Sequence, residues 1–206
     1  TLNNIQGFQS DTPDLTLTIN RSDLEQTMIG AKSLDAQIAD GTAKAVVKQG
    51  GKSWFFLTAD YAFGHSLEKD SSEVVVANGG KVLGAVRHPF PGTDFSSFLL
   101  KAQSSGAQVI GLANAGTDTT NSIKQAAEFG IVKGGQNLAG LLVFLTDIHA
   151  LGLPTAQGLI FTESWYWDLN DSSRAWTKRF AAANGGKYPS MVHAGVYSAV
   201  THYLKA

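Results

Sequence analysis

Hydrophobic and polar positions follow each other along most of this chain in blocks typical of alternating strands and helices. Short apolar runs predict strands at Ser53–Thr58, Lys81–Val86, Ala107–Ala113, Leu138–Thr146 and Leu159–Thr162. Apolar residues three and four positions apart predict helices at Phe63–Asn78, after Asp94, and from Thr117 or Asp118 to Gly130. Since the connections are short, the pattern predicts an α/β fold with a parallel sheet and right-handed crossovers.

Two further helices are expected near the end of the chain. One begins at Asp171 or Ser172 and carries Trp176 and Phe180. The other follows Pro189, and its apolar residues are Val192, Val196, Ala199 and Val200. No strand follows either helix, so we expect the fold to continue beyond this sequence.

The first forty residues have a different pattern. Leu15–Ile19 alternates apolar and polar residues with period two, which predicts a half-buried antiparallel strand. Ser22 and Glu25 have the spacing of a capping box, and Gly30 closes the short helix that they predict. A segment of this size rarely folds alone, so we expect it to pack against a partner.

Composition narrows the functional classes. The 206 residues are 43% hydrophobic and 16% charged, with a net charge of −1. No basic stripe is present to neutralise phosphates, which argues against nucleic acid or an anionic membrane as partner. There are no cysteines, and no apolar run is long enough to span a bilayer.

The loops that follow two of the predicted strands are candidates for a ligand site, because ligands bind at the carboxyl ends of strands in open α/β sheets. Tyr61 either covers a ligand or packs on the surface, and Asp60 either bonds a ligand ammonium group or caps the next helix. The small residues Asn114, Ala115 and Gly116 let a ligand approach the backbone, where free N–H groups favour a carboxylate. The alternative is a plain turn from strand to helix.

Three segments carry a resemblance to a known family: KAVVKQGGKSWFFLTADYAFG, GGKVLGAVRHPFPGTDFSSFLLKAQSSGAQVIGLANAGTDT and TDIHALGLPTAQGLIFTESWYWD. From about residue 41 to residue 206 the chain closely resembles the periplasmic solute-binding receptors of branched-chain amino acid-type ABC transporters, which have the type I periplasmic binding protein fold. The resemblance implies a periplasmic protein that clamps a small-molecule ligand between two lobes. It also implies that the closed form is presented to a membrane permease.

The resemblance also implies a domain organisation. Residues 43–168 correspond to the second, Rossmann-like lobe, and residues 169–206 to helices that cross back to a first lobe, which is missing here. Residues 1–42 are instead similar to the C-terminal sterol-carrier-like domain of metallo-β-lactamase-fold alkylsulfatases. The two resemblances meet at Asp40–Lys44, which suggests a fusion, an engineered chimera or a sequence assembled from two proteins.

Further site residues are implied by the family resemblance. Asp147 occupies the position where amino-acid receptors carry an acid that pairs with the ligand ammonium, although capping of the helix Ile148–Leu151 is an equal alternative. Thr146 and Phe144, close to Asp147 in the sequence, are weaker candidates for a ligand contact. Trp165 follows the last strand at the expected hinge, where it either lines a pocket or packs the seam between lobes.

The leading hypothesis is a solute-binding protein without catalysis, for a branched-chain or aromatic amino acid, an aromatic acid or a short amide. No serine-hydrolase elbow, nucleotide loop or metal-binding histidine spacing occurs, so we expect no catalytic residues, metal or cofactor. The alternatives are the C-terminal part of an alkylsulfatase-type enzyme and the ligand-sensing domain of a regulator. The sequence leaves the oligomeric state open.

Overall fold

The computed structural model describes residues 34–205, which fall into two units. One unit comprises the described residues up to Thr162, and the other begins at Glu163. The strand and helix predicted before Gly30 lie outside the described residues.

The first unit is built on a five-stranded sheet with the order β2-β1-β3-β4-β5, in which all pairs are parallel. The strands are β1 Ser53–Ala59, β2 Lys81–His88, β3 Val109–Ala113, β4 Asn137–Gly140 and β5 Leu159–Ile160. The predicted α/β fold with a parallel sheet is therefore confirmed.

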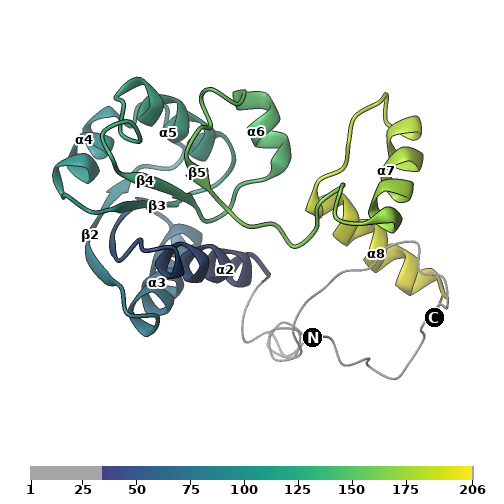
Figure 1. Cartoon of the computed structure of the whole chain (residues 1–206), viewed down its shortest axis with the longest axis horizontal. Helices are drawn as coiled ribbons and strands as arrows, with labels where there is room; N and C mark the ends of the chain where they lie inside the picture. The colour runs from purple at the N-terminus through teal and green to yellow at the C-terminus, as the bar shows by residue number, and fades with distance from the viewer. Residues whose placement is uncertain (1–33, 206) are drawn as a thin grey trace. The chain divides into compact units, whose positions relative to one another are not determined.

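Helices cover both faces of this sheet (Figure 1). Helices α2 Leu34–Lys48 and α3 Ala62–Ala77 pack on one face, and α4 Ser96–Ser104 and α5 Gly116–Glu128 on the other. The short helix α6 Leu145–Leu151 follows β4. Every residue of β1 and β3 is buried, as expected for strands that are covered on both faces.

Helix α2 was not predicted, and it runs through the boundary that we expected between residues 42 and 43. Ala39 and Ala43 lie on either side of this boundary, and both are fully buried in the cluster around Trp54 and Phe56. The Thr42 hydroxyl also bonds that of Thr162, at 2.8 Å. Residues 39 and 43 therefore belong to the same hydrophobic core.

The region after β3 differs in detail from the prediction. The expected strand Leu138–Thr146 ends at Gly140, and Leu145 and Thr146 lie in α6. Thr117 and Asp118 do not cap α5, whose N-cap residue is Ala115, and the predicted inward Ala127 is exposed. A continuous apolar run does not distinguish a buried strand from a buried loop and helix start, which explains the first difference.

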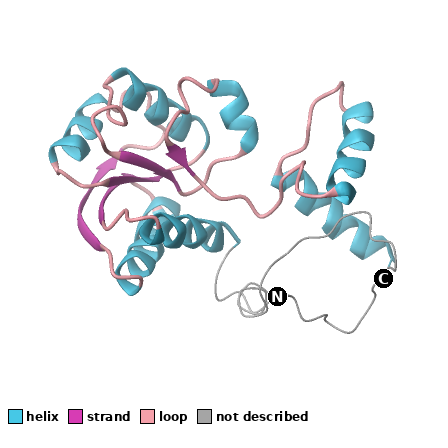
Figure 2. Ribbon diagram, viewed as in Figure 1, coloured by secondary structure: helices cyan, strands magenta, loops and turns pink. Residues whose placement is uncertain are grey.

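The second unit contains helices α7 Asp171–Ala183 and α8 Met191–Lys205, and Figure 2 shows no strand in its described part. Helix α7 is capped by Asn170, whose side chain accepts a hydrogen bond from the Ser173 N–H. Rings of Trp176, Phe180 and Tyr197 pack together between the two helices. The apolar residues predicted on the last helix are exposed: Val192, Val196, Ala199 and Val200.

Candidate ligand-binding site

The strand order places a topological switch point at the carboxyl ends of β1 and β3. The chain leaves β1 for α3 on one face of the sheet and leaves β3 for α5 on the other, so the two loops diverge. This point of divergence is where open α/β sheets bind ligands. Gly64 allows α3 to start close to both strands, since a Cβ there would lie 2.1 Å from the Ala59 carbonyl oxygen and 3.2 Å from that of Ala113.

Tyr61 is the N-cap residue of α3 and lies at the centre of a group of rings. Its ring stacks on Phe90 with centroids 4.4 Å apart, and on Phe63 with centroids 5.8 Å apart. Burial and, to a lesser extent, the negative charge of Asp118 raise the pKa of Tyr61 above its ordinary value. Because Asp118 belongs to α5, the structure brings Tyr61 together with the segment that follows β3.

Asp60 lies on the exposed side of the same loop. Its carboxylate bonds the His65 Nε2 at 2.7 Å, and its N–H donates to the His88 carbonyl oxygen. The carboxylate therefore contacts a residue of the first turn of α3. A ligand contact of Asp60 stays a prediction.

The Asn114 amide is engaged inside the protein. Its oxygen accepts from the Thr119 hydroxyl at 2.8 Å. Its nitrogen lies 3.1 Å from the Ser122 hydroxyl and 3.3 Å from the His88 Nε2. The side chain is fully buried, so the loop offers a ligand its backbone rather than this amide.

Ala115 and Gly116 form the exposed part of the loop after β3. Ala115 has an extended backbone and is partly exposed, while Gly116 has a φ of 58° and no atom near the position of a Cβ. Glycine adopts this left-handed conformation without the cost that other residues meet. The N–H groups at the start of α5 therefore border open space, and they suit a negatively charged group.

Sequence reasoning missed the buried residues behind these loops. His88 is the last residue of β2, and Asp118 lies in the first turn of α5. Both oxygens of Asp118 accept from the Gly92 N–H at 3.2 Å, and one lies 3.8 Å from the His88 Nδ1. The His88 Nδ1 in turn lies 2.9 Å from the Pro89 carbonyl oxygen. The signal that could have identified them is the position of two polar residues, His88 and Asp118, close to the ends of predicted strands.

Asp147 has a structural role in the short helix α6. Its carboxylate accepts a hydrogen bond from the Phe144 N–H at 2.9 Å, as the N3 residue of a helix does in a capping box. The neighbouring Thr146 is exposed. Since β4 lies next to β3, α6 begins at the same edge of the sheet as the other loops. A ligand contact of Asp147 or Thr146 stays a prediction.

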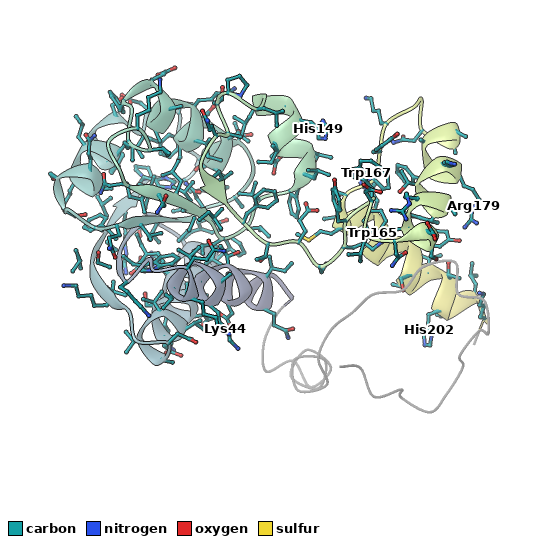
Figure 3. The ribbon with its side chains drawn as sticks, in the orientation of Figure 1. Lys44, His149, Trp165, Trp167, Arg179 and His202 are labelled. Carbon is teal, nitrogen blue, oxygen red and sulfur yellow. The ribbon has the colours of Figure 1, made fainter. Side chains whose placement is uncertain are left out.

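Trp165 belongs to the second unit. Its ring is buried and meets Trp176 edge to face, with centroids 5.2 Å apart. Figure 3 shows Trp165 and Trp167 beside the side chains of the two last helices, and Trp167 packs on Tyr188. A ligand contact of Trp165 stays a prediction.

Within the described residues, 34–205, none of the helices has the length and hydropathy needed to cross a bilayer. Nor do three or more potential metal ligands gather anywhere in this part of the chain.

Comparison with known proteins finds one matching family model, described as periplasmic binding protein, over residues 17–206. The match begins inside the segment that resembles alkylsulfatases, and no comparison supports that resemblance. Among curated proteins, none matches the chain.

Solved structures are similar over most of this chain. A periplasmic binding protein from Burkholderia mallei is 61% identical, with a TM-score of 0.77, over 83% of this chain and 45% of that one. A branched chain amino acid ABC transporter periplasmic ligand-binding protein from Burkholderia xenovorans is 40% identical, with a TM-score of 0.76, over 83% of this chain and 46% of that one.

A third similar structure contains a ligand. It is an ABC transporter solute binding protein from R. palustris in complex with benzoate, 25% identical, with a TM-score of 0.66, over 76% of this chain and 43% of that one. The chain thus spans less than half the length of these three proteins.

Proposed function

The chain belongs to the family of periplasmic binding proteins, and from this we propose that it is the solute-binding component of an ABC importer. It acts in the periplasm, where it captures a small solute and delivers it to a membrane permease. Members of this family bind substrates for transport rather than convert them, so we propose no catalytic step.

The arrangement at the carboxyl ends of β1 and β3 is the observation that supports a ligand site in this chain. Tyr61 supplies an aromatic surface there, and the start of α5 supplies N–H groups beside it. An aromatic or aliphatic body and a carboxylate are the two features that such a site recognises. The proposed ligand is therefore a small carboxylate-bearing solute.

The candidates within this class are branched-chain and aromatic amino acids and aromatic acids, with short amides beside them. Two relatives support the range, since one is named as part of a branched chain amino acid transporter and another was solved with benzoate. Asp60, Asn114, Ala115, Gly116, Thr146, Asp147 and Trp165 remain proposed contacts beside Tyr61.

The proposed mechanism is closure of two lobes about a hinge. In this proposal residues 43–168 form the second lobe, and residues 169–206 connect to a first lobe that the relatives' greater length accommodates. A ligand that touches both lobes stabilises the closed form, because it binds that form more tightly than the open one. The permease then recognises the closed form.

A thermal-shift screen of the full-length protein tests the proposal. The probes are leucine, phenylalanine, benzoate and a short amide. A probe at 100 times its Kd stabilises the folded protein by about 2.7 kcal/mol, which raises the Tm by a few degrees.

The Tyr61→Ala variant localises the effect. We expect it to remove most of the shift produced by the bound probe, while Tyr203→Ala, on a residue that is 80% exposed in α8, leaves the shift unchanged. A wild-type protein that responds to no probe would contradict the proposed function. If a probe raises the Tm of Tyr61→Ala as much as that of Tyr203→Ala, the proposed location of the site is wrong.

A further inference from the structure

Phe90 is an exposed aromatic residue at the edge of the candidate site. It follows β2, and its ring stacks on Tyr61 at an interplanar angle of 22°. Of the rings of Phe63, Tyr61 and Phe90, that of Phe90 is the most exposed, with 52% of its surface accessible. Single exposed apolar residues are common, so the exposure alone indicates nothing.

The loop that carries Phe90 is held by α5 at three points. Asp118 accepts from the Gly92 N–H with both oxygens. The Gln125 amide oxygen accepts from the Phe95 N–H at 2.7 Å, and its nitrogen donates to the Thr93 carbonyl oxygen at 3.0 Å. These contacts flank Phe90 on its C-terminal side, so a polar framework fixes the loop that presents an apolar ring to solvent.

Helix α5 contributes both to the candidate ligand site and to the contacts that hold the Phe90 loop. The N-terminal end of α5 borders the open loop at Ala115 and Gly116, and the same first turn carries Asp118. The Asp118 carboxylate is buried and bonds the loop rather than the open side. A helix that begins at the ligand site therefore also determines where the Phe90 ring lies.

We propose that Phe90 contacts the ligand together with Tyr61, that this pair selects ligands with a flat aromatic ring and a carboxylate, and that Asp118 is a positioning residue for Phe90. The inference rests on the proposed function and narrows its ligand class. Stacked rings interact most favourably with a further flat ring, which gains about 0.5–1.5 kcal/mol beyond the area that it buries. The ligand carboxylate lies at the N–H groups that begin α5.

The first test compares benzoate and leucine as probes of the full-length protein by titration calorimetry. Phe90→Ala is expected to weaken benzoate binding about fivefold and to change leucine binding by less than about twofold. The matched control is Phe129→Ala, because Phe129 is also exposed but lies at the opposite end of α5. It is expected to bind both probes as the wild type does.

The second test separates positioning by Asp118 from general stability. Asp118→Ala removes the acceptor for the Gly92 N–H and is expected to weaken benzoate binding as much as Phe90→Ala does. Asp118→Asn retains an acceptor oxygen and is expected to restore binding. The double variant with Phe90→Ala is expected to bind benzoate no more weakly than Phe90→Ala alone, because a residue that acts through Phe90 has no effect in its absence.

The outcomes distinguish this inference from the proposed function. Wild-type binding of benzoate that Phe90→Ala leaves unchanged overturns the inference and leaves the function standing. Binding of leucine but not of benzoate overturns the inferred preference for aromatic carboxylates and leaves the proposed function standing. Additive losses in the double variant overturn the role of Asp118. Binding of neither these probes nor the rest of the screened panel overturns the function, and the inference falls with it.

Discussion

The carboxylate of Asp147 has an observed role in the fold and a proposed role in ligand binding. In the structure it accepts a hydrogen bond from the Phe144 N–H and so stabilises the start of α6. The family resemblance instead implies an ion pair with a ligand ammonium group. The substitution Asp147→Ala removes both interactions, whereas Asp147→Asn removes only the negative charge.

Asp147→Ala is expected to lower the free energy of unfolding by about 1 kcal/mol, as loss of a helix cap does. Asp147→Asn keeps an acceptor for the Phe144 N–H and is expected to retain most of that stability. Chemical denaturation measures both effects. Equal stability of Asp147→Ala and the wild type would show that the cap contributes nothing.

The charge of Asp147 is tested by ligand choice. An ion pair with the ammonium group predicts that Asp147→Asn weakens binding of leucine and leaves binding of benzoate, which has no ammonium group, unchanged. A parallel loss for both ligands would point to a change of the fold near α6 rather than to a lost ion pair.

At this scale the sequence predicted where the loops after the strands lie but not how their side chains pair. Tyr61 and Asn114 follow recognisable strands, so their position at the sheet edge was predictable. Asp118 was interpreted as a helix cap, because its partner, the Gly92 N–H, lies in another loop. Hydrogen bonds of this kind depend on how α5 packs against the loop after β2, and no local pattern carries that information.

Among the elements, α3 depends on a residue without a side chain. A Cβ at Gly64 would lie 2.1 Å from the Ala59 carbonyl oxygen, a backbone atom, so the helix or the strand would have to shift. The approach places the first turn of α3, and with it Tyr61, directly against the ends of two strands. Gly195, in α8, has no neighbouring atom near the position of a Cβ.

These two glycines form a matched pair of substitutions. Gly64→Ala is expected to lower the free energy of unfolding by about 1–3 kcal/mol, because the new methyl group displaces the helix or the strand. Gly195→Ala is expected to raise it by about 0.5–1 kcal/mol, because alanine loses less conformational freedom in a helix. Thermal unfolding followed by circular dichroism compares them. A Gly64→Ala protein as stable as the wild type would contradict the close approach.

The elements with clear periodicity were predictable, and the irregular ones were not. Helices α3 and α7 and strands β1 and β3 lie within one or two residues of their predicted positions. Helix α2 escaped prediction since its sequence, LDAQIADGTAKAVVK, contains a glycine and a threonine in its interior, which disfavour a helix. Burial of Ala39, Ala43, Val46 and Val47 against the sheet outweighs that preference.

For the whole molecule, the division into two units has an experimental consequence. Both hydrophobic clusters of the sheet unit consist only of residues between Ala39 and Ile160. A protein comprising residues 34–162 is therefore expected to fold by itself, with a single cooperative transition in circular dichroism.

Tryptophan fluorescence provides the second measurement of this prediction. Of the four tryptophans in the sequence, only Trp54 remains in residues 34–162. It is fully buried, and its indole N–H donates to the Gly51 carbonyl oxygen at 2.8 Å. We expect a blue-shifted emission that is lost at the same temperature as the helical signal. Separate transitions, or none, would show that the sheet unit needs the rest of the chain.

The position of β1 between β2 and β3 also has a consequence for the order of events during folding. Strand β1 pairs with β2, which follows it closely in the sequence, and with β3, which is synthesised later. A nascent chain that has completed β1, α3 and β2 consequently exposes one unpaired edge of β1, a strand that is entirely buried in the folded protein, until β3 arrives. Such an edge can pair with strands from other chains, so delayed docking of β3 is expected to favour aggregation.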